Sequence, residues 1–522
     1  MSETGSGIVL VGMPASGKST VGRLVAERLG RPIIDTDEYL AHRLGMPVPA
    51  YLEQHGESAF RAEEAGAVVE ACAVPGAVIA TGGGAALDPL NRWALWHHGT
   101  VAWLHVTPDE LLRRLNGDAM PRPTLEPYGI ERLTTVLAER APVYRAADLR
   151  LDSARPAESI ADDLVANVKP MRGRRLLDAE VERHHPIGPR MARIVMGVDV
   201  SGEAPTGVSI VDRRLLDAAP GFVQALRSGT CLPVRAGERS KRLGSLEIIL
   251  EWLAEGRVER DTPLIAVGGG TIGDLAGTAA ALYARGLPLV HVPTTWVAQA
   301  DSAFGGKVAV DLSGAKNAVG AFWPPVAVIS DVAALRTLPL RLRRDGIAES
   351  IKAAIIGDAT LWRLLEDRGR RALRTDEPAR YAMLERSARL KLAVCERDPF
   401  EAGERRTLNL GHTVGHALEI ESRYRLPHGA AVALGMRAVA AIASGRGADP
   451  ELAPRLDALL DGLGFALRRT FDPNAVRTAM LADKKRRGGR QRWILPMEIG
   501  AVTEVDDVTD DELDGALGVI GA

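Results

Sequence analysis

The sequence predicts a protein of the α/β class that has more than one domain. Its 522 residues exceed what one hydrophobic core usually contains. Short apolar runs at residues 7–12, 32–37, 77–83 and 100–106 alternate with helix-like stretches, a pattern typical of parallel strands buried on both faces. Beyond about Leu338 the chain is rich in Ala, Leu and Arg and has few strand-like runs. We therefore expect a parallel sheet with helices on both faces first, and an all-helical lobe last.

Changes of pattern along the chain predict its domain boundaries. The amphipathic pattern of the first α/β stretch ends at Val168, and the next segment is rich in Arg, His and Pro without a sustained apolar period. Such a segment is expected to be a solvated linker. The predicted parts are a first α/β domain at residues 1–168, the linker at 169–190, a second α/β lobe at 191–337 and the all-helical lobe at 338–522.

The composition is that of a globular protein with small-molecule partners. The chain is 46% hydrophobic and 25% charged, and its net charge is −2. That balance gives no overall attraction to nucleic acid or to an anionic membrane, and we find no run of about 18 apolar residues. The three cysteines form no CxxC pair, which fits a reducing compartment. We expect a cytoplasmic protein that binds neither nucleic acid nor membrane.

Residues 12–20 (GMPASGKST) match the phosphate-binding pattern GxxxxGK[ST]. The motif follows an apolar strand and precedes a helix-like run, which is the context that phosphate binding requires. Gly12 and Gly17 let backbone N–H groups turn toward phosphates, Lys18 supplies a cation, and the Ser19 hydroxyl can ligate Mg²⁺. Together with Thr20, these residues predict a site for ATP and Mg²⁺.

Four further clusters favour phosphoryl transfer over simple hydrolysis. Asp35 and Asp37 follow the second strand, where one carboxylate can serve Mg²⁺ and the other an acceptor hydroxyl. The remaining clusters offer cations and an open backbone, and they are Phe60-Arg61 with Glu64, residues 81–84 (TGGG), and Arg122-Pro123 with Arg140. Taken singly, each of them is equally consistent with a surface ion pair or a turn.

Taken together, these motifs resemble shikimate kinase over roughly residues 8–168, including residues 140–144 (RAPVY). The resemblance implies ATP-dependent phosphorylation of shikimate, with Lys18, Asp37 and Arg122 as catalytic residues. It also implies that Asp35 acts on Mg²⁺ through water and that Arg114 approaches the adenine. The implied shikimate contacts are Asp37, Arg61, Gly82, Gly83 and Arg140.

A second group of motifs lies in the second α/β stretch. Residues 268–274 (GGGTIGD) follow the apolar run 264–267, where a dinucleotide pyrophosphate can approach the backbone. The pattern is not GxGxxG, so a structural turn is an alternative. Lys307, Lys316 and Asn317 then fall within a Gly-rich region, which suits an anionic substrate.

Three histidines lie within seventeen residues, and Glu349 with Lys352 precedes them. His412 and His416 share a helix face because they are four residues apart. Spacing alone therefore favours this pair as metal ligands and leaves His428 as a loop residue.

The complete set resembles 3-dehydroquinate synthase, an NAD- and zinc-dependent cyclising enzyme of the same aromatic pathway, over roughly residues 233–499. The resemblance replaces the local assignment, because Glu349, His412 and His428 match the ligands of Zn²⁺ (or Co²⁺), and His416 matches a contact to the substrate phosphate. Catalytic roles are implied for Lys307, Lys352 and His416. The implied NAD⁺ contacts are Glu238, Lys241, Gly269, Gly270, Asp274, Thr294, Thr295 and Lys316. The implied substrate contacts are Arg285, Lys307, Asn317, Lys391, Arg405, Asn409, His416, Lys484 and Lys485.

The resemblance also implies a reaction in which 3-deoxy-D-arabino-heptulosonate 7-phosphate becomes 3-dehydroquinate and phosphate. NAD⁺ removes a hydride, phosphate leaves by elimination, the ketone is reduced back, and the opened ring closes in an aldol step, with zinc as a Lewis acid. A homodimer through the synthase half is implied as well.

The chain departs from the family pattern in places. We find no N-terminal hairpin between Arg190 and Glu238, and the shortened stretch makes Asp212 a weak match to an adenosine-ribose contact. Ala430 follows His428-Gly429 where Glu is more usual, and Val308 stands where Thr is frequent.

Other interpretations of the second half stay open, namely another sugar-phosphate cyclase, a metal-dependent polyol dehydrogenase, or a non-catalytic module that dimerises or stabilises the kinase. Lys391 and Arg405 favour a substrate with a carboxylate, and a polyol dehydrogenase would release NADH. Because the two implied activities are not adjacent in the pathway, we expect the halves to work independently. Fragments ending near Lys169 and beginning near Pro186 are then expected to keep their activities.

Overall fold

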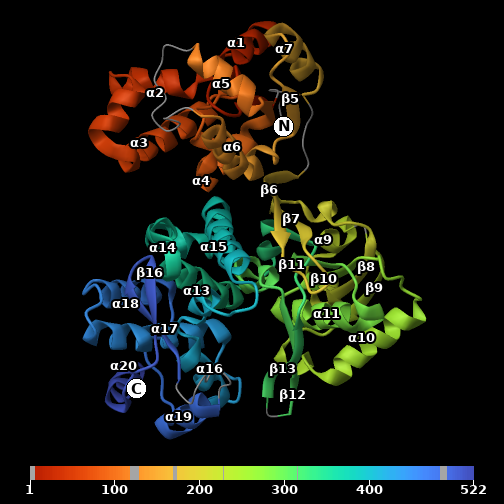
Figure 1. Ribbon diagram of the computed structural model, residues 1–522, viewed down its shortest axis with the longest axis vertical. Helices are drawn as coiled ribbons and strands as arrows, with labels where there is room; N and C mark the ends of the chain where they lie inside the picture. The colour runs from red at the N-terminus through yellow and green to blue at the C-terminus, as the bar shows by residue number, and fades with distance from the viewer. Residues whose placement is uncertain are drawn as a thin grey trace. The chain divides into compact units, whose positions relative to one another are not determined.

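The computed structural model describes residues 6–117, 129–168, 173–226, 228–313, 315–482 and 491–521 (Figure 1). The chain divides into two compact units. The first comprises Met1–Glu180 with Arg193–Val200, and the second comprises Val181–Ala192 with Ser201–Ala522.

The first unit is built on a five-stranded parallel sheet in the order β2-β3-β1-β4-β5. Its strands are β1 (Gly7–Val11), β2 (Ile33–Asp35), β3 (Val78–Ala80), β4 (Gly99–His105) and β5 (Leu149–Asp152). The first four confirm the strands expected from apolar runs. The chain places β3 on one side of β1 and β4 on the other, and such a switch point opens a crevice at the carboxyl end of the strand.

Helices surround this sheet, as the alternating pattern predicted (Figure 1). They are α1 (Lys18–Leu29), α2 (Thr36–Leu44), α3 (Val48–Cys72), α4 (Pro89–His98), α5 (Pro108–Asn116), α6 (Ile130–Tyr144) and α7 (Ala157–Ala166), with a short 3₁₀ turn η1 (Ala85–Leu87). Val21 and Val25 of α1 and Leu164 of α7 pack with Ile8 and Leu10 of β1 in one buried cluster. This core holds the start of α1 against the end of β1.

Part of the expected linker is a strand. β6 (Arg174–Arg183) and β7 (Arg190–Val198) are neighbours in a sheet, so residues 174–183 are not a solvated linker, and the paired strands that we did not find in the sequence are present. Residues 169–172 lie outside the described residues. Arginines interrupt the apolar pattern of this segment in the sequence, and in the fold their charges are paired. The buried carboxylate of Asp178 accepts from Arg193 at 3.0 and 2.8 Å and lies 3.4 Å from Arg175.

The second unit contains the parallel strand series β14-β11-β10-β8-β9. These strands are β8 (Gly207–Asp212), β9 (Ser228–Val234), β10 (Leu264–Gly268), β11 (Leu289–Pro293) and β14 (Ala327–Asp331), and an antiparallel pair is formed by β12 (Lys307–Leu312) and β13 (Ala315–Phe322). The associated helices are α8 (Arg213–Ala218), α9 (Pro220–Ala225), α10 (Leu243–Glu255), α11 (Gly270–Leu282) and α12 (Trp296–Ala300). The 3₁₀ turns are η3 (Ser201–Glu203), η4 (Glu238–Ser240), η5 (Tyr283–Arg285), η6 (Ser302–Phe304) and η7 (Val332–Arg336). β10 and β11 were expected.

The last part of this unit is mostly helical (Figure 1). Its helices are α13 (Leu340–Gly357), α14 (Ala359–Ala372), α15 (Glu377–Arg397), α16 (His412–Glu421), α17 (His428–Gly445), α18 (Leu452–Leu463), α19 (Pro473–Ala482) and α20 (Asp510–Ile520), with a 3₁₀ turn η8 (Glu404–Asn409). The expectation of an all-helical lobe is wrong in one respect. Strands β15 (Trp493–Glu498) and β16 (Ala501–Val505) pair antiparallel, because β15 buries Trp493, Ile494 and Leu495 beside α17.

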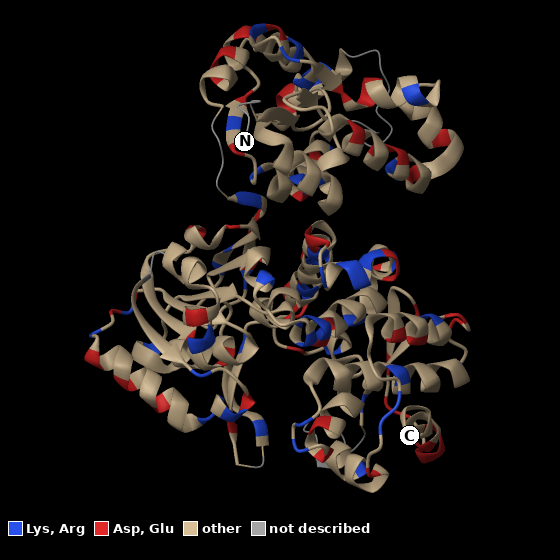
Figure 2. Cartoon of the chain, turned by 180° about the vertical axis from the view of Figure 1, so that it is seen from behind, with Lys and Arg blue, Asp and Glu red and all other residues tan. Residues whose placement is uncertain are grey.

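Charged residues of both signs are interspersed along the helices of each unit (Figure 2). This distribution accords with the nearly neutral net charge of −2. Within the described part of the chain, no helix combines the length and the apolar character needed to cross a bilayer.

Candidate active sites

The phosphate-binding loop lies between β1 and α1, where the sequence predicted it. Gly12 and Gly17 have φ values of +148° and +88°, and these backbone conformations favour glycine. The loop ends at Lys18, the first residue of α1, so a phosphate here would also meet the N-terminus of that helix. The buried Lys18 ammonium donates to the carbonyls of Gly12 at 3.1 Å and Met13 at 2.9 Å.

The two predicted Mg²⁺ residues lie together. Ser19 Oγ donates to Oδ2 of Asp35 at 2.5 Å. The other carboxylate oxygen of Asp35 accepts from the backbone N–H groups of Asp37 and Glu38 and so caps α2. Hydroxyl and carboxylate oxygens are ligands that Mg²⁺ prefers, and the cap keeps the carboxylate facing the loop.

The predicted acceptor residues line one cavity of about 320 Å³. The cavity is bounded by the phosphate-binding loop through Pro14 and Ser19, and by the predicted side chains Asp37, Arg61 and Arg140. Glycines 82–84 allow a close approach here. A Cβ atom at Gly82 would lie 2.4 Å from Oδ1 of Asp37, and one at Gly84 would lie 2.7 Å from Nη1 of Arg61.

Three predicted arginines of this unit hold backbone atoms or acids. Arg140 donates to the carbonyl of Gly83 at 2.8 Å, and Arg61 pairs with the buried Glu64 at 2.7 Å. Burial raises the pKa of Glu64, and Arg61 opposes that rise. Arg114 donates to the backbone carbonyls of Ala15 at 3.3 Å and Ser153 at 2.6 Å, which places it over the loop. The predicted catalytic residue Arg122 lies outside the described residues.

In the second unit, the Gly-rich turn between β10 and α11 has close neighbours. A Cβ atom at Gly269 would lie 2.9 Å from Cγ2 of Thr295, and one at Gly270 would lie 3.1 Å from Oγ of Ser302. Thr294 is buried, and Thr295 caps α12. The turn therefore offers a bare backbone at the carboxyl end of β10, the position where parallel sheets bind dinucleotides.

The charged residues among the predicted NAD⁺ contacts form two ion pairs. The buried Lys241 ammonium lies 2.6 Å from Oδ2 of Asp274 and donates to the side-chain oxygen of Asn317. Burial raises the pKa of Asp274 to about 6. Lys316 pairs with Oε1 of Glu238 at 3.1 Å. Asn317, which we predicted as a substrate contact, thus lies among the predicted dinucleotide residues.

Glu349, His412 and His428 form a three-ligand cluster, with one ligand atom from each lying within 4.8 Å of the others. Oε1 of Glu349 is 3.0 Å from Nε2 of His428 and 3.7 Å from Nε2 of His412. His412 and His428 are the first residues of α16 and α17, and Glu349 lies in the buried part of α13. Two imidazoles and one carboxylate are the donor set of a catalytic zinc site that keeps one position open.

Both histidines have a partner on the other ring nitrogen. Nδ1 of His412 lies 3.1 Å from the carbonyl of Leu410, and Nδ1 of His428 lies 3.3 Å from Oε1 of Glu419. Such partners fix the tautomer that leaves Nε2 available to a metal. Burial alone would lower the pKa of His428, but hydrogen bonds to Glu349 and Glu419 raise it to about 10. His416, Glu419 and His428 form a second cluster of ligand type, which shares His428 with the first.

The predicted substrate-binding cations lie close to this cluster and are held by acids. Asp301 is 2.8 Å from the ammonium of Lys391 and 3.5 Å from that of Lys352, which in turn lies 2.5 Å from Oε2 of Glu349. Burial favours the neutral form of Asp301, but the two lysines leave its pKa below the usual value.

Glu401 connects two other predicted substrate residues. Its carboxylate lies 2.5 Å from the ammonium of Lys307 and accepts from the amide of Asn409 at 3.1 Å. Burial lowers the pKa of Lys307, and Glu401 opposes that effect. Arg405 is buried and donates to the carbonyls of Pro399 and Gly305.

Some predicted residues are not part of these networks. Arg285 is exposed at the end of η5. Asp212 caps α8, and Lys484 and Lys485 lie outside the described residues. Sequence reasoning missed the roles of Asp301, Glu401 and Glu419. Only Glu419 had a signal in the sequence, since it lies seven residues after His412 and three after His416 on the same helix face.

The two sites define a phosphotransferase unit with a phosphate-binding loop, joined to an enzyme unit with a dinucleotide-type turn and a metal-ligand cluster. Three family models match the chain in succession, for shikimate kinase at residues 14–169, for the N-terminal part of 3-dehydroquinate synthase at 231–345 and for its C-terminal part at 346–486. The chain belongs to the 3-dehydroquinate synthase family and carries a shikimate kinase domain ahead of the synthase domains.

The individual relatives include enzymes of two different names. The chain is 42% identical over 338 residues to 3-dehydroquinate synthase of Xanthomonas campestris, an alignment that covers 62% of this chain and 90% of that protein. It is also 42% identical over 294 residues to 2-epi-valiolone synthase of Actinosynnema mirum, covering 54% and 76%. The solved structure of a 2-epi-5-epi-valiolone synthase from Streptomyces hygroscopicus with NAD⁺ and Zn²⁺ bound is 27% identical, covers 60% of this chain and 90% of that one, and superposes with a TM-score of 0.57.

Proposed function

We propose that the chain is a bifunctional enzyme of aromatic biosynthesis. The first unit phosphorylates shikimate with ATP and Mg²⁺. The second converts 3-deoxy-D-arabino-heptulosonate 7-phosphate to 3-dehydroquinate and phosphate with NAD⁺ and a zinc ion. We further propose that the synthase half forms a homodimer, which light scattering of the purified chain would test.

The kinase is supported by one cavity that is lined both by residues proposed to hold Mg²⁺ and by residues proposed to bind shikimate. Ser19 and Asp35, the proposed Mg²⁺ residues, line it together with Asp37, Arg61 and Arg140. The arginines can hold a substrate carboxylate, and Asp37 can accept the proton of the attacking hydroxyl. A phosphate on the loop and a hydroxyl at Asp37 would then lie within one enclosed space, which is what direct phosphoryl transfer requires.

The observation that supports the synthase is the metal-ligand cluster bordered by lysines. The donor set of Glu349, His412 and His428 fits Zn²⁺, which would supply a Lewis acid, and the turn at residues 268–274 would hold NAD⁺, which would supply hydride chemistry. Lys352 is 2.5 Å from the ligand Glu349, so its ammonium can donate to an oxygen of a substrate there. Lys307 and Asn409, held by Glu401, can receive the phosphate.

The relative named 2-epi-valiolone synthase supports a second candidate for the substrate, a seven-carbon ketose phosphate without a carboxylate. Two features favour the carboxylate-bearing substrate. Lys391 and the buried Arg405 both lie close to Gly305, where a Cβ atom would be 3.4 Å from Cε of Lys391 and 3.1 Å from Nη2 of Arg405. The shikimate kinase domain on the same chain also supports a synthase that acts on a carboxylated substrate.

One set of assays on the purified chain tests the proposal. We expect shikimate-dependent release of ADP, and release of phosphate from the heptulosonate phosphate without net NADH. Phosphate release from a ketose 7-phosphate that lacks the carboxylate, in place of the acid, would show the other cyclase activity. Net accumulation of NADH would show a polyol dehydrogenase.

A further inference from the structure

The end of β6 and the turn after it belong to the second unit, and the last residue of β6 is a buried arginine. Residues 181–192 are part of this unit, although they are separated in the sequence from its larger segment, residues 201–522. Arg183 is only 6% exposed, whereas its neighbours Glu182 and His184 are exposed. A guanidinium is costly to bury, so its position calls for a specific partner.

The partner of Arg183 is a backbone carbonyl next to the proposed substrate site. Nη2 of Arg183 donates to the carbonyl of Phe304 at 2.6 Å, and Nη2 of Arg405 donates to the next carbonyl, that of Gly305, also at 2.6 Å. The following carbonyl, that of Gly306, accepts from the backbone N–H of Trp323 at 2.6 Å. Three successive carbonyls are therefore held by three separate parts of the chain.

The segment held in this way lies between two residues of the proposed substrate site. Asp301, which holds Lys352 and Lys391, precedes it, and Lys307 follows it directly as the first residue of β12. Gly306 has a φ of +67°, and a Cβ atom there would lie 2.9 Å from Cα of Pro324. A shift of this segment would consequently move the carboxylate of Asp301 or the ammonium of Lys307.

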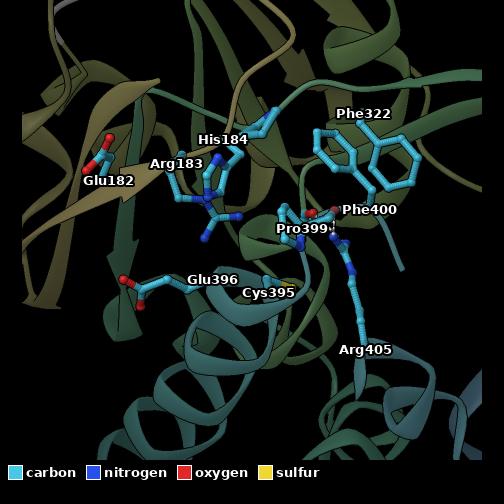
Figure 3. Close-up of a pocket in the computed structure, with 11 residues that line it drawn as sticks. Glu182, Arg183, His184, Phe322, Cys395, Glu396, Pro399, Phe400 and Arg405 are labelled. Carbon is cyan, nitrogen blue, oxygen red and sulfur yellow. Dashed lines mark hydrogen bonds between the residues drawn. The ribbon is translucent and has the colours of Figure 1, made fainter. Parts of the chain in front are cut away.

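A second contact connects the turn after β6 with Trp323, whose backbone N–H donates to the carbonyl of Gly306. The ring of His185 packs edge-on against the ring of Trp323, with centroids 4.2 Å apart. Figure 3 shows Arg183 and Arg405 entering one pocket from different parts of the chain, with Phe322 and Phe400 beside them. Nη1 of Arg183 is buried and has no hydrogen-bond partner among the described residues. The guanidinium is therefore held by the hydrogen bond from Nη2 to the carbonyl of Phe304.

We infer that Arg183 is a positioning residue of the synthase, which holds residues 302–306 so that Asp301 and Lys307 face the substrate. The inference rests on the proposed function of this unit. A misplacement of about 1 Å in such a segment can cost on the order of 100-fold in rate, so loss of this one bond has a measurable consequence.

The test uses the full chain with three substitutions. Arg183→Met keeps the aliphatic part of the side chain and removes the guanidinium donors, Arg183→Lys keeps a cationic donor nitrogen, and Glu182→Gln is the control at an exposed neighbour. We expect Arg183→Met to lower synthase kcat/KM by about 10- to 100-fold, chiefly through kcat, with kinase activity and zinc content unchanged. Arg183→Lys should recover part of the loss, and Glu182→Gln should match the parent.

Hydrogen–deuterium exchange separates this inference from the proposed function. In Arg183→Met, peptides spanning residues 302–308 should exchange faster while the rest of the unit is unchanged. Unchanged exchange in these peptides, or faster exchange throughout the unit, would overturn the positioning role whatever the substrate is. A parent chain that releases no phosphate from the heptulosonate phosphate would refute the proposed function instead, and the exchange comparison would still decide the role of Arg183.

Discussion

Nε2 of His428 lies 3.0 Å from Oε1 of Glu349, although the two residues are 79 positions apart in the chain. This contact identifies the third member of the metal-ligand cluster. Sequence spacing alone had favoured His416, which shares a helix with His412. The contact follows from the packing of α13 beside α17, which brings Glu349 to the first residue of α17.

The first prediction separates the two histidines. His428→Ala should release the metal, because it removes one of three ligands. His416→Ala should retain the metal and weaken the handling of the substrate phosphate. Metal analysis of both purified variants is the measurement, and zinc loss from His416→Ala with retention in His428→Ala would contradict the assignment.

The second prediction concerns Glu419, whose Oε1 lies 3.3 Å from Nδ1 of His428. Glu419→Ala should lower zinc affinity by about 10- to 100-fold, since the ring loses the group that fixes its orientation. Glu419→Gln keeps an acceptor oxygen and should lose less. Competition with a chelator measures both affinities. Equal affinity in the parent and Glu419→Ala would show that the imidazole is held by other contacts.

The third prediction concerns Lys18. Lys18→Ala should lower the rate of shikimate phosphorylation by at least about 100-fold, because the transferring phosphate loses a cation. Synthase turnover of the same sample should persist and serves as the control for folding. A kinase rate near that of the parent would refute the role of Lys18.

The fourth prediction concerns where the chain can be divided. A cut near Pro186, which looked harmless from the sequence, removes Arg183 from the synthase unit. A fragment of residues 173–522 should keep synthase activity within about a factor of three, or under ~1 kcal/mol, whereas residues 186–522 should be much less active. Kinetic assays of both purified fragments are the check. Equal activity of the two would argue against any role of β6 in the synthase.

The fifth prediction concerns acid sensitivity. Burial lowers the pKa of His185 to about 4, below the value of about 6.5 in an unfolded chain. The neutral ring is favoured in the fold, so its contribution to stability is complete above about pH 6.5 and is lost as pH falls toward 4. His185→Phe keeps an aromatic ring against Trp323 and should reduce the loss of stability between about pH 7.5 and about pH 5. Urea unfolding at the two pH values measures this, and an equal loss in both proteins would contradict it.

The site residues were predicted from two kinds of evidence in the sequence, namely local motifs and resemblance to a family. The phosphate-binding loop, the strand before it and the pair Ser19 and Asp35 could be predicted, since each motif is local or lies at the end of a recognisable apolar strand. His412 was favoured as a metal ligand by its spacing from His416, whereas the complete set with Glu349 and His428 was found only through resemblance to a family. No rule of spacing connects a residue in α13 with the first residues of two later helices.

The strand β6 shows the opposite case, in which a local pattern was misleading. Its arginines suggested a solvated segment, yet Asp178 pairs with two arginines and Arg183 bonds to the carbonyl of Phe304, so the charges are accommodated within the fold. Charge satisfaction of this kind depends on partners far away in the sequence.

The amino-acid order thus decided the α/β class, the nucleotide loop and the kinds of chemistry available, because these depend on short motifs and on apolar periodicity. Tertiary structure decided which acids hold which cations. Asp301, Glu401 and Glu419 acquire their roles from residues on other elements, since an isolated carboxylate in a sequence carries no information about the ammonium or imidazole that will lie within 4 Å of it.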